Sequence, residues 1–154
     1  MCITDIFDIP LVLAGRKGWK MDDFLLKTPQ KVKDKILFTG FIDEEDLPYI
    51  YNMADLFVFP SKYEGFGLPP LEAMTCGALV LSSDAEAMVE VLSEGALYFS
   101  NNNLTDLISK LKDIYSNIEN NKSKMKTSGM KQADRFDWKK QADRLLLYLG
   151  DKGK

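Results

Sequence analysis

Residues 60–74 carry the groups best suited to binding a charged, polyhydroxylated ligand. They read Pro-Ser-Lys-Tyr-Glu-Gly-Phe-Gly-Leu-Pro-Pro-Leu-Glu-Ala-Met, which predicts a strand end, a glycine-flanked loop and then a helix. Pro69 or Pro70 suits the first helical turn, because no backbone N–H donor is needed there. The amides of Gly67 and Leu68 would then point out of the helix N-terminus, where free N–H groups and the helix dipole favour a phosphate.

Two carboxylates flank this predicted anion site. Glu64 lies in the loop before the helix and Glu72 is expected in its first turn, so both can face one crevice. Carboxylates repel a diphosphate, but each can accept hydrogen bonds from a vicinal diol such as the ribose hydroxyls. A ligand with diols on both sides of a diphosphate is a nucleotide sugar. The simpler alternative is that Glu64 caps a turn, Glu72 complements the helix dipole and the glycines permit a tight connection.

The composition argues against several other kinds of site. No histidine occurs among the 154 residues, which removes histidine metal ligands and Ser-His-Asp or Cys-His nucleophiles. Cys2 and Cys76 show neither a disulfide framework nor CxxC spacing, so a reducing cytoplasm fits best. The net charge of −3 gives no electrostatic reason to expect nucleic acid as a partner. No apolar run approaches the roughly 20 residues that a membrane-spanning helix needs.

Short apolar runs alternate with helical periodicity over residues 1–100. The runs that predict buried strands are 9–14, 35–39, 56–59, 78–81 and 96–99, and the clearest helices between them are 44–53 and 69–75. This alternation predicts an α/β fold with a Rossmann-like parallel sheet flanked by helices. Because ligands of open α/β sheets bind outside the carboxyl ends of the strands, the loops at Gly15, Gly40, Pro60 and Ser82 should line one crevice.

Only helices are expected after residue 100. Apolar spacing predicts helices over 104–118 and 138–149, and the polar stretch 120–128 favours a solvated helix over a mobile connection. The length suits one domain over 1–154, with a βα core over 1–100 and C-terminal helices over 101–154.

The spacing of the two glutamates resembles a family motif. Seven residues separate Glu64 from Glu72, and Ala73-Met74 and then Cys76-Gly77 follow. Further segments that look like family segments, in family order, are 11–15, 38–41, 54–61 and 136–138. Together they resemble the C-terminal, donor-binding domain of the family-4 (group 1) retaining glycosyltransferases. The resemblance implies one half of a GT-B fold, in which two Rossmann-like domains face each other.

The resemblance also implies roles for the motif residues. Glu64 would contact the donor sugar and act in catalysis, and Glu72 would bind the ribose. The phosphates would meet the backbone of Gly65, Phe66, Gly67 and Leu68. Ile42 would contact the nucleobase, although Phe41 and Ile42 could equally form a hydrophobic staple onto the next helix.

The same resemblance implies the ligands and partners. The donor substrate would be a nucleoside-diphosphate sugar, with no metal and no other cofactor, and the missing partner would be an N-terminal acceptor-binding domain. The arginine and lysine that neutralise the departing diphosphate in the family have no counterpart before Ile9. Arg16, Lys17 and Lys62 could substitute in part or be ordinary surface charges.

Two functions from different classes are consistent with these expectations. The first is a glycosyltransferase that moves a hexose from a nucleoside-diphosphate sugar to a hydroxyl acceptor with retained configuration, this chain being its donor-binding half. The second is a module that binds a nucleotide sugar without turnover. A sugar-nucleotide epimerase is disfavoured because the expected loops hold no further acid–base pair. A cytoplasmic location is expected, with membrane association of the full enzyme left open.

Overall fold

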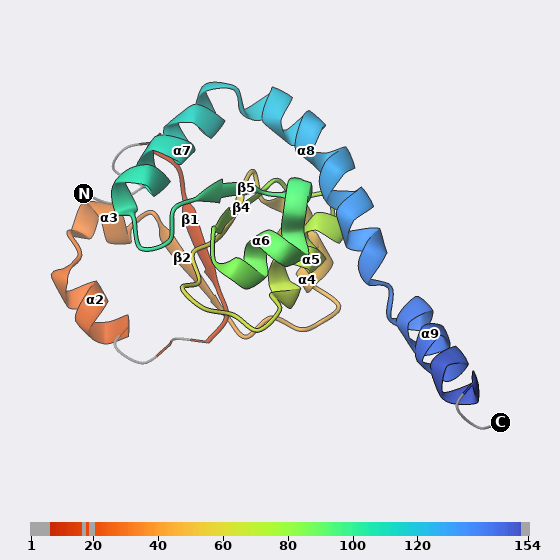
Figure 1. Cartoon of the computed structure of the whole chain (residues 1–154). Coiled ribbons are helices and arrows are strands. Elements are labelled where there is room, and N and C mark those ends of the chain that lie inside the picture. Colours follow the sequence, from red (N-terminus) through yellow and green to blue (C-terminus); the bar gives the residue numbers. More distant parts are fainter. Residues whose placement is uncertain (1–6, 17, 19–20, 152–154) are drawn as a thin grey trace. The chain divides into compact units, whose positions relative to one another are not determined.

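The computed structural model describes residues 7–16, 18 and 21–151 of the chain (Figure 1). It divides into two compact units, Met1–Leu47 and Pro48–Lys154. Both units combine parallel strands with helices, which confirms the α/β class expected from the sequence. The assignment of 1–154 to a single domain stays a prediction.

The first unit is built on two parallel strands, β1 (Leu11–Ala14) and β2 (Ile36–Gly40). The chain between them forms α2 (Met21–Lys27) and α3 (Gln30–Lys33), which the sequence analysis did not predict. A parallel pair requires such a long crossover. Helix α2 buries none of its residues, which is consistent with the lack of a strong apolar period in its sequence. Helix α3 anchors the crossover through Val32, which is 1% exposed.

The second unit holds a three-stranded parallel sheet. Its strands are β3 (Phe57–Phe59), β4 (Val80–Ser83) and β5 (Leu97–Phe99), in that spatial order. Their register sets Phe59 opposite Ser82 and Ser82 opposite Tyr98, so the carboxyl ends of the three strands lie level. Three of the predicted apolar runs are therefore confirmed as parallel strands.

The boundaries of β4 differ from the expected 78–81. The strand begins at Val80 and continues through Ser82 and Ser83, all of which are fully buried. Two serines can occupy a buried strand here because their hydroxyls find acceptors: Ser82 Oγ donates to the Ser83 carbonyl at 3.1 Å, and Ser83 Oγ donates to the Ser61 carbonyl. Apolar content alone therefore ends the strand too early.

Helices connect the strands of this sheet. They are α4 (Leu47–Met53) before β3, α5 (Leu68–Thr75) between β3 and β4, and α6 (Glu86–Leu92) with a 3-10 turn at Ser93–Gly95 between β4 and β5. The sequence analysis predicted the first two, although α4 begins three residues later than expected, and it did not predict α6. Helix α6 forms because Met88, Val91 and Leu92 are buried, a packing that a seven-residue apolar pattern reveals poorly.

The predicted C-terminal helices are confirmed, with one revision. Asn103 is the N-cap of α7 (Leu104–Ser116), and its side chain accepts a hydrogen bond from the Asp106 amide at 3.0 Å. Helix α8 (Ile118–Ala133) covers the polar stretch 120–128. Helix α8 is not simply solvated, because it buries Met125, Gly129 and Gln132. The Gln132 amide donates to the Val91 carbonyl at 2.7 Å, so α8 is hydrogen-bonded to α6.

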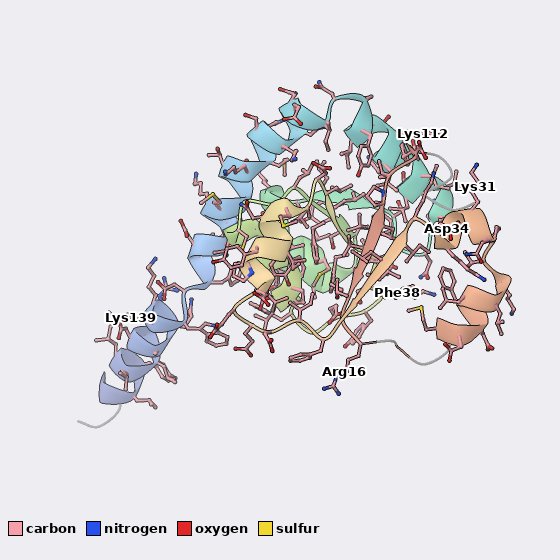
Figure 2. All side chains as sticks on the ribbon, turned by 180° about the vertical axis from the view of Figure 1, so that it is seen from behind. Arg16, Lys31, Asp34, Phe38, Lys112 and Lys139 are labelled. Carbon is pink, nitrogen blue, oxygen red and sulfur yellow. The ribbon has the colours of Figure 1, made fainter. Side chains whose placement is uncertain are left out.

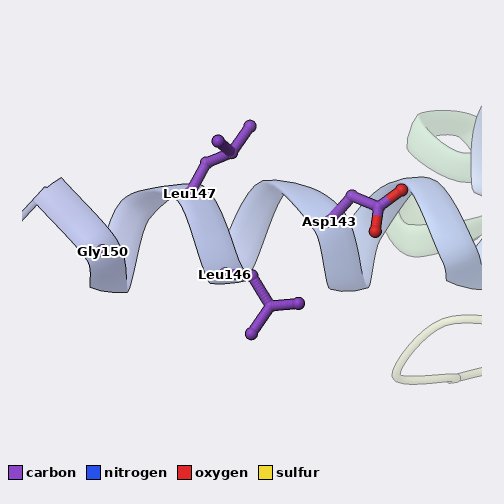
Figure 3. A pocket seen from close by; sticks show the side chains of 4 residues that line it. All are labelled: Asp143, Leu146, Leu147 and Gly150. Carbon is purple, nitrogen blue, oxygen red and sulfur yellow. The ribbon is translucent and has the colours of Figure 1, made fainter.

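Helix α9 (Trp138–Asp151) follows a 3-10 turn at Asp134–Phe136. Its described side chains, 138–150, are all exposed, and Leu146 and Leu147 project from different sides of the helix (Figure 3). Among the described residues, no helix is long and apolar enough to cross a membrane.

The burial of Leu111 in the second unit can be tested by mutation. This α7 side chain is 1% exposed, whereas Leu147 of α9 is 73% exposed. We expect Leu111→Ala to lower the free energy of unfolding by about 2–4 kcal/mol, because truncation removes apolar contacts and leaves a cavity. Leu147→Ala, the matched control, should change it by less than about 0.5 kcal/mol. Urea unfolding measures both, and equal losses would contradict the assigned core.

Candidate functional site

The carboxyl ends of β3, β4 and β5 are joined by hydrogen bonds outside the sheet itself. The Asp84 amide donates to the Phe99 carbonyl at 2.9 Å, and the Asp84 carboxylate accepts the Asn101 amide at 2.6 Å. The Asn101 side chain in turn donates to the Lys62 carbonyl at 2.8 Å. The loops after Pro60 and Ser82 therefore meet, as expected. The loops at Gly15 and Gly40 belong to the first unit, so a crevice shared by all four loops stays a prediction.

A hollow of about 400 Å³ lies at this edge of the sheet. Its lining residues are Lys62, Tyr63, Glu64, Asp84, Ala85, Glu86, Ala87, Glu90 and Asn101. Four of them carry carboxylates and one carries an ammonium group. Carboxylate oxygens accept hydrogen bonds and repel anions, so the hollow is suited to a neutral, hydroxyl-rich group and not to a phosphate.

Glu64 lines this hollow and is half-buried. Its Oε1 accepts a hydrogen bond from Ser61 Oγ at 2.9 Å, and the same hydroxyl lies 3.2 Å from the Tyr63 carbonyl. The described residues offer no hydrogen-bond donor to Oε2. One carboxylate oxygen is thus oriented by the protein and the other can accept a ligand hydroxyl.

Glu72 lies one turn further along α5 than its expected place in the first turn. Its Oε2 accepts a hydrogen bond from the Tyr51 hydroxyl at 3.0 Å. Tyr51 is only 8% exposed, and its ring packs edge to face on Phe57 with centroids 5.4 Å apart. Burial, followed by the hydrogen bond and the charge of Glu72, raises the pKa of the Tyr51 phenol well above its usual range. Glu72 does not line the hollow that holds Glu64.

The sequence analysis did not identify Tyr51 as part of the site. It included Tyr51 only as part of the predicted helix 44–53. The available signal was chemical, because a tyrosine on a buried helix face must find a partner for its hydroxyl. Burial raises the pKa of the nearby Cys76 thiol, and the charge of Glu72 raises it further.

The N-terminus of α5 has an unusual entry. Gly67 precedes the helix with a φ of 88°, and Pro69 and Pro70 occupy its first turn. Prolines have no N–H, so the free donors are reduced to the Leu68 amide and the preceding loop amides. Among the described residues, the amides of 65–68 donate to no backbone or side-chain oxygen. They can therefore serve an anion.

The loop also makes an aromatic contact with the turn before α9. Phe66 packs edge to face on Phe136, with ring centroids 5.5 Å apart. Such a pair contributes roughly 0.5–1.5 kcal/mol beyond its buried area. The side of the loop that carries Phe66 is thereby held by the C-terminal helical region.

The predicted base-contacting residue, Ile42, lies in the first unit and is half-buried. Phe41 beside it is 67% exposed, and the Arg16 guanidinium lies 5.6 Å from the centroid of its ring. Figure 2 shows the Arg16 side chain extending away from the ribbon. Lys17 lies outside the described residues. Neither base contact nor the hydrophobic staple is tested by these positions, so both stay predictions.

Within residues 7–16, 18 and 21–151, no cluster of three or more Asp, Glu, Cys or His side chains could hold a metal ion.

The fold and the strand-end site define a Rossmann-like α/β domain that can bind a ligand at the carboxyl edge of its sheet. The sequence profile of glycosyl transferases group 1 matches residues 4–132. The chain belongs to this family. Helix α9 lies beyond the matched residues.

Individual relatives agree with this assignment. The O-antigen chain mannosyltransferase B of Escherichia coli is 36% identical over 132 residues, which are 84% of this chain and 34% of that protein. The serotype-specific mannosyltransferase WbdA of Escherichia coli is 33% identical over 132 residues, or 16% of its length. The chain thus spans about a third or less of these curated relatives.

Solved structures share the fold. The C-terminal domain of a group 1 family glycosyl transferase (LpcC) from Francisella tularensis is 25% identical, with a TM-score of 0.61, over 86% of this chain and 89% of that one. Anabaena HepE, crystallised with UDP, is 19% identical, with a TM-score of 0.80, over 94% of this chain and 42% of that one. The chain therefore corresponds to the C-terminal half of a GT-B glycosyltransferase.

The two glycines of the loop should respond differently to substitution. A Cβ on Gly67 would lie 2.8 Å from Sδ of the fully buried Met88, and its left-handed backbone disfavours any side chain. We expect Gly67→Ala to lower the free energy of unfolding by roughly 1–3 kcal/mol. A Cβ on Gly65 would meet nothing within 4 Å. Gly65→Ala is thus the control and should melt like the parent chain. Equal melting shifts would contradict the strained entry into α5.

Proposed function

We propose that this chain is the donor-binding domain of a retaining glycosyltransferase that moves a hexose from a nucleoside-diphosphate sugar to a hydroxyl acceptor. The observation that carries the proposal is the arrangement around α5, where two oriented carboxylates and free backbone amides surround one helix N-terminus. Its relatives in Escherichia coli are named as mannosyltransferases, which favours mannose as the hexose.

Glu72 is proposed to bind the ribose. Its carboxylate is exposed, so both ribose hydroxyls can reach it, and the Tyr51 hydrogen bond fixes its direction. A tyrosine phenol is already neutral at physiological pH, and burial raises the pKa of Tyr51 further, so Tyr51 leaves the negative charge of Glu72 intact. A charged acceptor makes stronger hydrogen bonds to a diol than a neutral one does.

The diphosphate is proposed to lie against the amides of Gly65, Phe66, Gly67 and Leu68. These amides have no acceptor among the described residues, and they lie at the positive end of the α5 dipole. Placing the anion at the amides keeps it off the carboxylates of the hollow. Lys62 is the cationic residue among those that line the hollow.

The transferred sugar is proposed to occupy the acidic hollow, with Glu64 as its principal contact. A developing oxocarbenium-like sugar is stabilised by nearby negative charge that is oriented before the reaction. Glu64 is half-buried, which strengthens that interaction relative to bulk water. Ile42 is proposed to contact the base from the first unit, and an N-terminal domain is proposed to supply the acceptor pocket.

Nucleotide binding tests the role of Glu72. We expect Glu72→Ala to weaken binding of nucleoside diphosphates by roughly 1–3 kcal/mol, because the ribose loses a charged acceptor. Glu119→Ala, an exposed glutamate in α8, is the control and should bind like the parent. Calorimetry with UDP, GDP and ADP measures the affinities, and amide NMR should show shifts at 65–68 and at Ile42. Shifts confined to residues after 103 would contradict the proposed site.

Turnover tests the role of Glu64. The chain alone is expected to bind donor without transferring sugar at a useful rate, and transfer should appear when an acceptor-binding N-terminal domain is added. In that pair, Glu64→Gln should lower kcat about 100-fold or more and change KM little, if its contact strengthens in the transition state. A radiolabelled donor measures the product. Robust transfer by the 154-residue chain alone would overturn the half-enzyme proposal.

A further inference from the structure

We infer that Ser83 and Ser61 are positioning residues for Glu64, and that together they connect the buried sheet to the carboxylate. The inference rests on the proposed function, because it gives Glu64 its role at the sugar. Ser83 ends β4 and is fully buried, whereas Glu64 lines the hollow. Two hydrogen bonds join them through Ser61.

The first hydrogen bond fixes the start of the loop. Ser83 Oγ donates to the carbonyl of Ser61, two residues after β3 ends at Phe59. One residue further along, the Lys62 carbonyl accepts from the Asn101 side chain at 2.8 Å. Two successive peptide groups of the loop are therefore held by side chains from the end of β4 and from the loop after β5. This fixes the direction in which the Ser61 side chain leaves the backbone.

The second hydrogen bond orients the carboxylate. Ser61 Oγ has one hydrogen to donate, and its shorter contact is to Glu64 Oε1 at 2.9 Å, against 3.2 Å to the Tyr63 carbonyl. A glutamate side chain loses conformational entropy when it is ordered. A carboxylate that is ordered before the ligand arrives does not incur this loss on binding.

Ser82 shows that burial of a serine does not by itself require such a connection. It is also fully buried and adjacent in β4, but its hydroxyl donates to the carbonyl of its neighbour, Ser83, at 3.1 Å. That bond stays within the strand. The two serines thus share burial, strand and residue type, and only Ser83 reaches the loop of Glu64.

Carboxyl NMR tests the connection without any ligand. In a chain labelled with ¹³C at the glutamate carboxyl carbons, we expect Ser61→Ala and Ser83→Ala to shift the Glu64 signal at neutral pH. Ser82→Ala should leave that signal in place, and Ser61→Thr should restore the parent position because it keeps the hydroxyl. The Glu72 signal is the internal reference, since it should move only when Tyr51→Phe removes its own donor.

Sugar recognition tests the consequence. The measured quantity is the ratio of the Kd for a nucleoside diphosphate to the Kd for its sugar, with GDP against GDP-mannose and UDP against UDP-glucose as probes. We expect Ser61→Ala and Ser83→Ala to lower this ratio about two- to tenfold, as for loss of one hydrogen bond. Affinity for the diphosphate itself should change less than about twofold, because the phosphate contacts remain.

The outcomes separate the inference from the proposed function. If Ser83→Ala and Ser61→Ala leave the Glu64 signal unshifted, as Ser82→Ala is expected to do, the inferred connection is wrong. That result does not depend on what the chain binds. If the signal shifts but no nucleotide sugar binds, the proposed function fails and the structural connection holds. Should Ser83→Ala fail to fold, Ser61→Ala with its Ser61→Thr rescue decides both measurements, because Ser61 is only half-buried.

Discussion

The second unit depends on the complete burial of β4. All four of its residues, Val80 to Ser83, are 0% exposed. A strand buried on both faces cannot leave a hydroxyl without a partner, since an unpaired buried polar group costs about 1–3 kcal/mol. Ser82 satisfies its hydroxyl within the strand and Ser83 satisfies its own at Ser61. The requirement that stabilises the core therefore also sets where the site loop begins.

A second constraint acts on α5 from α8. A Cβ on Gly129 would lie 3.3 Å from Cγ of the fully buried Met74, and one on Gly95 would lie 3.0 Å from Cβ of Gln132. Small residues therefore allow α8 and the 3-10 turn after α6 to approach α5 and each other closely. A helix whose sequence is mostly polar thus becomes a direct support for α5. This packing acts on the last turn of α5, where Met74 lies.

Local patterns predicted the elements better than the contacts between them. Parallel strands read as continuous apolar runs, which is why all five strands were found in the sequence, although only β4 is buried along its whole length. The end of β4 was missed because the Ser83 hydroxyl is satisfied by donating to the Ser61 carbonyl, 22 residues away in the sequence. The pairing of Tyr51 with Glu72, 21 residues apart, was missed for the same reason. A motif places both glutamates, but the donor to Glu72 comes from a helix that lies outside the motif.

The identity of those donors has an electrostatic consequence. Tyr51 and Ser61 are hydroxyl groups, and among the described residues no salt bridge involves Glu64 or Glu72. An arginine or lysine would orient a carboxylate equally well, but it would also compensate its charge. A hydroxyl donor gives direction and leaves the charge available. In the function proposed above, both glutamates are held in place while their negative charge stays available to a diol or to a sugar that becomes positive as its bond to the diphosphate breaks.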